Sequence, residues 1–188
     1  MIYFLRHCEK EKGYFYDENK KILDDPLGAE GILHAQRIAE RFRDIEISRI
    51  IASGYKRAYQ TALPTARAKG LAVETDERVN EINNGELRYM DETEAAEKFP
   101  GFWSEYARGD KDVRFPGGES GGDVIKRQDG FLKDMEKETG NVLVVSHDGF
   151  IRQLVSNILG APVWRRDRLK TSYGSLTIIE FTRNGWII

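Results

Sequence analysis

Two of the three histidines in the chain follow short apolar segments with the composition of buried β-strands. His7 comes after Ile2–Leu5 and is preceded by Arg6, and His147 comes shortly after Val142–Val145. Imidazole has a substantial neutral, nucleophilic fraction at physiological pH, whereas a guanidinium group stays charged and binds phosphate through two parallel hydrogen bonds. These residue types are suited to phosphoryl transfer, with a histidine as nucleophile and cations on the phosphate oxygens.

Two further segments add a second arginine and an acid. Arg57 comes shortly after the apolar segment Arg49–Ala52, and Glu81 lies downstream of Leu71–Val73. Each residue alone has an ordinary alternative: Arg57 as a surface cation, Glu81 as an exposed acid and His147 as a core histidine. Ligands of open α/β sheets bind outside the carboxyl ends of the strands, so the joint placement of these residues favours one shared site.

The elements that must position these residues alternate along the chain. Helical periodicity is found in four segments: 30–42, Lys56–Lys69, Asp123–Lys137 and Phe150–Leu159, the second of which should kink at Pro64. A fifth apolar strand is predicted over Leu176–Phe181. This alternation predicts an α/β fold, a three-layer sandwich with a mostly parallel central sheet. The stretch from about Asn83 to Gly122 breaks the rhythm, carries exposed-looking aromatic residues and is predicted to form a lid over the strand ends.

Composition narrows the class of protein. The chain has 188 residues, 40% of them hydrophobic, which favours a single domain over 1–188. Its 29 Lys and Arg against 31 Asp and Glu give a net charge of −2, so no basic field favours nucleic acid. One cysteine excludes an internal disulfide, and no apolar run approaches the ~18 residues of a membrane span. We expect a cytoplasmic protein with a small phosphorylated substrate and no nucleic-acid or membrane partner; the oligomeric state stays open.

At these residues the chain resembles the histidine phosphatase superfamily, in its phosphoglycerate-mutase-like branch. The matching segments, in the order of the family, are Leu5-Arg6-His7-Cys8-Glu9, Asp25-Pro26-Leu27 with Gly31, Ser53–Ala62 as Ser-x-x-x-Arg-Ala-x-x-Thr-Ala, Glu81 with Gly85, Pro116-Gly117-Gly118-Glu119-Ser120 with Arg127, and Val145-Ser146-His147. The resemblance spans residues 2 to about 155. It implies a phosphoglycerate-mutase-like fold with a short lid insertion.

The resemblance also implies a mechanism. His7 would attack phosphorus in line and form a phosphohistidine, while Arg6, Arg57 and His147 would neutralise the equatorial oxygens. Glu81 would protonate the leaving oxygen and then deprotonate the water that hydrolyses the intermediate. The side chains supply the positive charge, so neither a metal nor another cofactor is expected.

The chain departs from the family pattern at four positions. Cys8 stands where the family usually has Gly, and Asp148 where the first Gly after the second histidine usually stands. Either side chain could crowd the phosphate pocket, and Asp148 would add a negative charge there unless it points away. Gly28 occupies a usual Thr position, which removes an N-cap hydroxyl, and Gly13 stands where mutases commonly have Asn. These departures keep a phosphoester-binding protein without turnover as an alternative.

Other residues of the chain allow three alternative interpretations. Cys8 is not a nucleophile of the Cys-x5-Arg kind, because Tyr14 stands where that arginine would be, so a buried or half-buried thiol is predicted. A zinc hydrolase using His7, His147 and nearby acids is an alternative, although no His-x3-His spacing occurs. The basic run of Arg165, Arg166, Arg168 and Lys170 is interpreted as a solvated face, with a second anionic substrate group as the alternative partner.

The residues after Glu81 bear on the choice between phosphatase and mutase. Mutases of this branch resemble Glu-Arg-His-Tyr-Gly at that point, whereas this chain has Ile82-Asn83-Asn84-Gly85, without basic residues to hold a carboxylate. Residues 91–120 resemble the short lid of the small phosphatases, with Phe99-Pro100 and Trp103 as landmarks. We therefore expect a metal-independent phosphatase acting on small phosphate monoesters, with mutase-type phosphoryl transfer as the alternative.

Overall fold

The computed structural model describes residues 1–20 and 22–188 and contains a central six-stranded sheet in the order β5-β4-β6-β1-β7-β8. Its strands are β1 Ile2–Arg6, β4 Arg49–Ala52, β5 Val73–Thr75, β6 Val142–Ser146, β7 Leu176–Thr182 and β8 Gly185–Ile187. The first four strands in this order run parallel, and β7 and β8 are antiparallel to their neighbours. The predicted mostly parallel sheet is confirmed. As a consequence β1, β4 and β6 end at one edge of the sheet, where Arg6, Ala52 and Ser146 lie.

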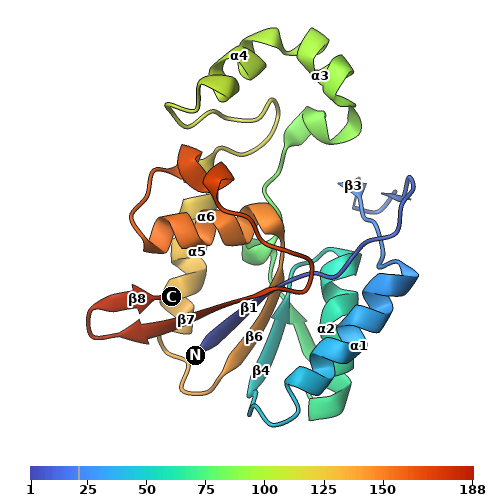
Figure 1. Ribbon diagram of the computed structural model, residues 1–188, viewed down its shortest axis with the longest axis vertical. Helices are drawn as coiled ribbons and strands as arrows, with labels where there is room; N and C mark the ends of the chain where they lie inside the picture. The colour runs from blue at the N-terminus through green and yellow to red at the C-terminus, as the bar shows by residue number, and fades with distance from the viewer. Residues whose placement is uncertain (21) are drawn as a thin grey trace.

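Helices cover both faces of the sheet (Figure 1): α1 Ala29–Arg41 and α2 Lys56–Lys69 on one face, α5 Gly121–Met135 and α6 Asp148–Ile158 on the other. Side chains of β1 alternate between two hydrophobic cores. Phe4 packs against aromatic rings of α5 and α6, and Tyr3 packs edge to face on Phe42 beside α1. The predicted three-layer α/β sandwich is confirmed.

Capping and helix closure move three of the predicted boundaries. The strand predicted over Leu71–Val73 begins at Val73, because the Leu71 amide still donates to the Ala66 carbonyl and closes α2. The helices α5 and α6 start two residues earlier than predicted. Ser120 caps α5 by accepting from the Asp123 amide, and His147 is the N-cap of α6. These starts precede the first periodic apolar residue, so hydrophobic spacing could not reveal them.

Two other helix predictions concern α1 and α2. Gly28 is the N-cap of α1 and makes no side-chain cap, as its missing hydroxyl predicted. The helix α2 continues through Pro64 and ends at Gly70, which is left-handed with φ 65°. Its first amide, at Lys56, is capped from outside the helix by the buried carboxylate of Asp24, at 2.7 Å. This contact fixes the start of α2, the helix that carries Arg57.

The lid predicted over 83–122 lies beyond the carboxyl ends of the parallel strands (Figure 1). Its elements are the 3-10 helix η2 Gly85–Tyr89 and the helices α3 Glu92–Lys98 and α4 Pro100–Arg108. Phe102 and Tyr106 are half-buried rather than exposed, because they pack on each other and on Phe115. The lid is therefore anchored to the core by its aromatic residues.

The remaining described elements are short. They are the hairpin of β2 Tyr16–Asp17 and β3 Ile22–Leu23, and the 3-10 helices η1 Glu77–Val79 and η3 Val163–Arg168. Among residues 1–20 and 22–188, no helix is both long and apolar enough to cross a membrane.

Candidate active site

Arg57, in the first turn of α2, lies between the two histidines at the strand ends. Its Nε is 3.3 Å from Nε2 of His7, which follows β1, and its Nη2 is 3.2 Å from Nδ1 of His147, which follows β6. The two imidazole rings are 5.0 Å apart between centroids. All three side chains are buried, with residue exposures of 5% for His7, 9% for Arg57 and 0% for His147. The fold thus brings together three residues that the sequence placed on separate elements.

The hydrogen bonds of His7 define its tautomer. Its Nδ1 lies 2.8 Å from the Cys8 carbonyl oxygen, which only accepts, so Nδ1 carries the hydrogen. The lone pair is then on Nε2, where it accepts from Arg57. Burial, followed by the charge of Arg57, lowers the pKa of His7 to about 3. His7 therefore presents a neutral, nucleophilic Nε2 toward the cationic centre of the cluster.

His147 is oriented by a relay of side chains. Because Arg57 only donates, Nδ1 of His147 accepts, and its Nε2 donates to Ser53 Oγ at 2.7 Å. Ser53 in turn donates to Oδ1 of Asn80 at 2.8 Å. Burial and the charge of Arg57 lower the pKa of His147 well below its usual value. Ser53 is the first residue of the matched arginine motif, but nothing in the sequence pointed to Asn80.

Glu81 sits at the N-terminus of α6. Its carboxylate accepts from three backbone amides: Ile82 at 2.9 Å, Phe150 at 3.0 Å and Gly149 at 3.2 Å. The positive end of the helix dipole favours a carboxylate at this place. A Cβ at position 149 would lie 2.7 Å from Oε1 of Glu81, so Gly149 is the residue that lets the carboxylate approach the helix.

Arg6, at the end of β1, is held by the segment before β7. Its guanidinium carbon lies 4.3 Å from the centre of the Tyr173 ring, and its Nη1 donates to the Thr171 carbonyl at 2.7 Å. The carboxylate of Asp148 lies 3.8 Å from the same Nη1 and accepts from Thr171 Oγ1 at 2.7 Å and Arg152 Nη1 at 2.9 Å. Burial opposes ionisation of Asp148, but these hydrogen bonds lower its pKa. Asp148 therefore faces the cations and offsets part of the Arg6 charge.

Cys8 is a buried core thiol, as predicted. Its side chain belongs to the hydrophobic core beside α1 and α2, and burial raises its pKa to about 11. Its backbone amide donates to Thr61 Oγ1 at 3.0 Å, and that hydroxyl donates to the Arg57 carbonyl. Thr61 thus ties the loop of His7 to the helix of Arg57.

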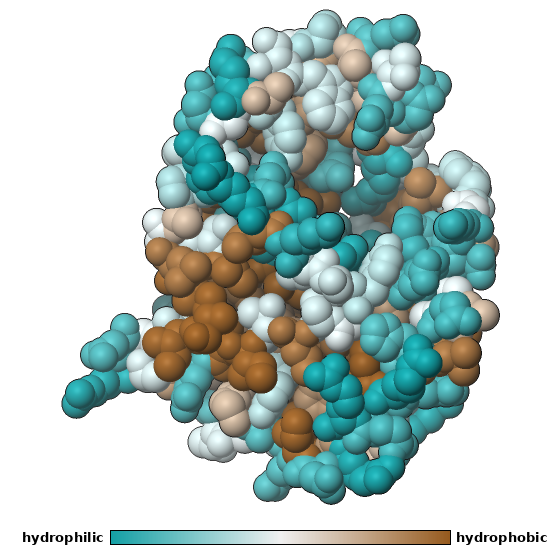
Figure 2. Space-filling model, in the orientation of Figure 1, coloured by the Kyte–Doolittle hydropathy of each residue, from teal (hydrophilic) through white to brown (hydrophobic). Residues whose placement is uncertain are grey.

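A cleft of about 760 Å³ adjoins the cluster. It is lined by Lys20, Ile22, Gly54, Tyr55, Thr75, Glu77, Asn80, Glu81, Asn83, Arg88, Glu119 and Arg127. Figure 2 shows the surface hollowed below the lid. Glu81 lines the cleft, and Tyr55 both lines it and packs against the His147 ring, at 5.2 Å between centroids. Glu81 therefore belongs to both regions, since it lines the cleft and its charge acts on Arg57.

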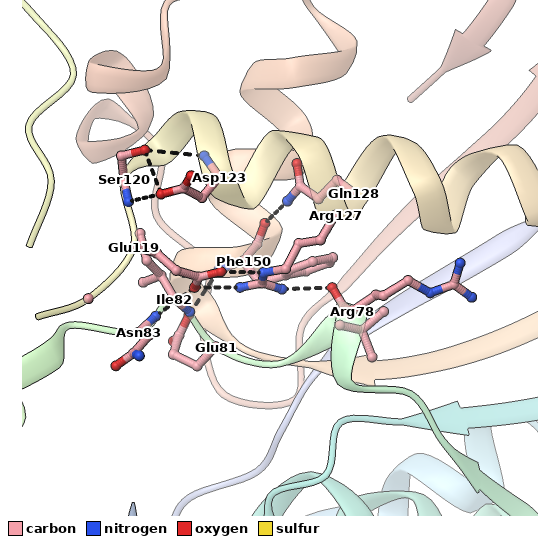
Figure 3. A network of polar contacts seen from close by, with 12 residues as sticks. Arg78, Glu81, Ile82, Asn83, Glu119, Ser120, Asp123, Arg127, Gln128 and Phe150 are labelled. Atoms are coloured by element: carbon pink, nitrogen blue, oxygen red, sulfur yellow. Dashed lines mark hydrogen bonds and ion pairs between the residues drawn. The ribbon is translucent and has the colours of Figure 1, made fainter.

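The Pro-Gly-Gly-Glu-Ser segment joins the lid to α5 (Figure 3). Glu119 accepts from Nε of Arg127 at 2.9 Å and from the amide of Asn83 at 2.8 Å. Arg127 also donates to the Arg78 carbonyl at 2.7 Å. These contacts hold the chain immediately after Glu81, so Glu119 and Arg127 support the position of the acid.

Two alternatives from the sequence find no support in the structure. Within 1–20 and 22–188, no group of three or more His, Cys, Asp and Glu side chains is arranged to hold a metal ion, so a zinc hydrolase lacks a ligand set there. The basic run does not line the cleft. Its interpretation as a solvated face is wrong for Arg166, which is 5% exposed and donates to the Val163 carbonyl.

The sequence model of the histidine phosphatase superfamily, branch 1, matches residues 2–188. This chain is a member of that superfamily. A protein of Salmonella choleraesuis (strain SC-B67) described as "Probable phosphoglycerate mutase GpmB" is 31% identical over 191 residues, covering 99% of this chain and 87% of that protein. The predicted resemblance is confirmed, and membership supports an enzyme of the phosphatase or mutase type.

Solved structures share the fold of this superfamily member. The alpha-ribazole phosphatase of Shigella flexneri superposes with a TM-score of 0.81 at 20% identity, over 98% of this chain and 92% of that one. A mycobacterial glucosyl-3-phosphoglycerate phosphatase in complex with VO3 gives 0.80 at 24% identity, over 99% and 95%. At these identities the likeness establishes the fold alone.

Proposed function

We propose that this protein is a metal-independent phosphatase that hydrolyses small phosphate monoesters through a phosphohistidine on His7. The observation that carries the proposal is the contact of the neutral His7 Nε2 with Arg57, which also reaches His147. A phosphate bound by the Arg57 guanidinium would lie beside the lone pair of His7. Phosphatases among the structural neighbours are consistent with this activity.

In the first step Nε2 of His7 attacks phosphorus while the bond to the ester oxygen breaks. The imidazole becomes positively charged, and its Nδ1 hydrogen already points to the Cys8 carbonyl, which stabilises that charge. Arg6 and Arg57 bind the equatorial oxygens. His147 donates to one of them after taking up a proton, which the approaching dianion favours over the buried neutral state.

Glu81 is proposed to handle the proton, since it lies where the cleft meets the cluster. Glu81 takes up a proton as the phosphate dianion binds and gives that proton to the leaving oxygen, so that an alcohol departs through the cleft and a carboxylate remains. It then takes a proton from water as that water attacks the phosphohistidine, which regenerates neutral His7 and releases phosphate. The carboxylate must loosen its bonds to the Gly149 and Phe150 amides to do so.

Mutase-type transfer is the second candidate, because the Salmonella relative is described as a phosphoglycerate mutase. In this chain the segment 82–85 contains no basic residue, unlike the Glu-Arg-His-Tyr-Gly segment of the mutases. The structure ties that segment to Glu119 through the Asn83 amide. Phosphatase is therefore the better-supported function.

The test is hydrolysis of p-nitrophenyl phosphate in EDTA by the wild type, His7→Ala and His34→Ala. The third histidine, His34 on α1, is the matched control. We expect turnover that survives EDTA, is lost in His7→Ala and persists in His34→Ala, with base-stable phosphohistidine trapped in the wild type alone. Phosphate binding without turnover would favour the non-catalytic alternative, and transfer to a phosphoglycerate acceptor in place of water would favour the mutase.

A further inference from the structure

Arg88, on η2 of the lid, is a cleft cation without an acidic partner. In the described part of the chain no carboxylate lies within ion-pair distance of it, and its hydrogen bond is a long one, 3.4 Å to Oδ1 of Asn83. Two other cations of the cleft are neutralised: Lys20 by Asp24 at 2.7 Å, and Arg127 by Glu119 at 2.9 Å. Arg88 is half-buried, so its uncompensated charge favours an anion in the cleft.

The position of Arg88 relates this charge to the catalytic cluster. Its guanidinium carbon lies 5.8 Å from the centre of the Tyr55 ring, and that of Arg57 lies 4.5 Å from the same centre. The two guanidinium carbons are therefore at most about 10 Å apart. One small molecule can reach both, with its phosphate on Arg57 and its leaving group beside Arg88.

The carboxylates of the cleft do not cancel this charge. Glu119 is paired with Arg127, and Glu81 is held by three backbone amides. Glu77 is solvent-exposed. A guanidinium group binds carboxylate or phosphate through a bidentate fork, so either oxyanion fits the geometry of Arg88.

We propose that Arg88 binds a second anionic group on the leaving group of the substrate. The substrate class is then a small phosphate monoester that also carries a carboxylate or a second phosphate. This inference rests on the proposed phosphatase function for the identity of the first anion. Arg88, which lines the cleft, would then bind the second anionic substrate group that the sequence had suggested for the basic run of 165–170.

The test is calorimetric binding of non-hydrolysable analogues, so it does not depend on turnover. Benzylphosphonates with a 4-carboxylate or a 4-carboxamide match in size and differ in charge, and 1,4-xylylene bisphosphonate supplies the second-phosphate arm. We expect the wild type to bind the 4-carboxylate, the bisphosphonate or both at least roughly tenfold more tightly than the carboxamide. A tenfold difference in affinity corresponds to the free energy of a charge-assisted hydrogen bond. Arg88→Gln should abolish the preference while leaving carboxamide affinity unchanged, and Arg88→Lys should retain part of it.

Arg108→Gln is the matched control, because Arg108 is an exposed lid arginine outside the cleft and should leave the preference intact. Equal affinities in the wild type, a preference that survives Arg88→Gln, or no binding of any analogue would each overturn the subsite. A preserved preference in a protein that fails the His7 assay would leave Arg88 as an anion-binding residue and refute the phosphatase instead. Unchanged carboxamide affinity confirms that the variant is folded.

Discussion

Asp148 offers the sharpest test of how charge is balanced around the phosphate site. Its carboxylate lies 3.8 Å from Arg6 Nη1, and the two side chains are 25% and 18% exposed. Asp148→Asn removes the negative charge and keeps an oxygen that can accept from Thr171. Arg6 also keeps its hydrogen bond to the Thr171 carbonyl, so its position should persist. The variant therefore frees the Arg6 charge, and inorganic phosphate should bind more tightly.

The magnitude follows from the exposure of the pair. Ion pairs at exposed sites contribute ~0.2–1 kcal/mol, and this pair is more buried than that, so about 1 kcal/mol is a reasonable estimate. That free energy corresponds to roughly a fivefold decrease in the dissociation constant of phosphate. Loss of an acidic side chain from the first turn of α6 should lower the free energy of unfolding by ~0.3–1 kcal/mol.

The assay is competitive inhibition by phosphate, or calorimetry, at low and high salt, because screening should shrink the effect. Asp167→Asn is the control, since Asp167 also pairs with Arg152 but makes no contact with Arg6. It should change phosphate affinity less than twofold. Unchanged or weaker phosphate binding by folded Asp148→Asn would refute the reasoning and show that the carboxylate orients Arg6 rather than neutralising it.

Three further predictions concern the acid and the nucleophile. Glu81→Gln should slow alkyl phosphates ~10²–10⁴-fold more than p-nitrophenyl phosphate, and equal losses would remove Glu81 from the acid role. Gly149→Ala should reproduce that leaving-group dependence in a folded protein, because its Cβ would meet Oε1 of Glu81 at 2.7 Å. Between pH 6.5 and about 3 the unfolded chain binds a proton at His7 that the folded one excludes. This exclusion contributes ~1.4 kcal/mol per pH unit to the fall in the free energy of unfolding in urea as the pH is lowered, in addition to the contribution of His147, and His7→Gln should reduce the slope by that amount.

The meeting of His7, Arg57 and His147 was predictable because parallel strands end at one edge of a sheet. Each of these residues lies within a few positions of the end of a parallel strand, so the pattern of strands alone was enough to predict that they meet. Alternation of apolar segments likewise predicted the layers. Boundaries were less accurate, since the capping residue Ser120 and the closing bond at Leu71 are local geometries that hydrophobic spacing does not encode.

The polar contacts that refine the site were not predictable, because they join residues far apart in the chain. Asp148 takes its direction from Thr171, which lies beyond the last matched motif, and Asn80 reaches Ser53 across 27 positions. The lid aromatics looked exposed because Phe115, on which Phe102 and Tyr106 pack, lies outside the helix that carries them. The sequence did not single out Arg88, because the absence of a carboxylate partner among the described residues around it depends on the folded structure.

The burial of Arg57 shows how the fold prepares for an anion. Burying a cation is costly unless it is paired, yet in the described residues Arg57 contacts two imidazoles and a Tyr ring, with no carboxylate at ion-pair distance. Burial lowers its pKa, and the more distant Glu81 opposes that shift. A phosphate dianion would supply the missing counter-charge. Because Asp148 already offsets Arg6, Arg57 should contribute more than Arg6 to phosphate binding. Bound phosphate would pair with the buried guanidinium group of Arg57, and relief of its unfavourable burial would strengthen binding.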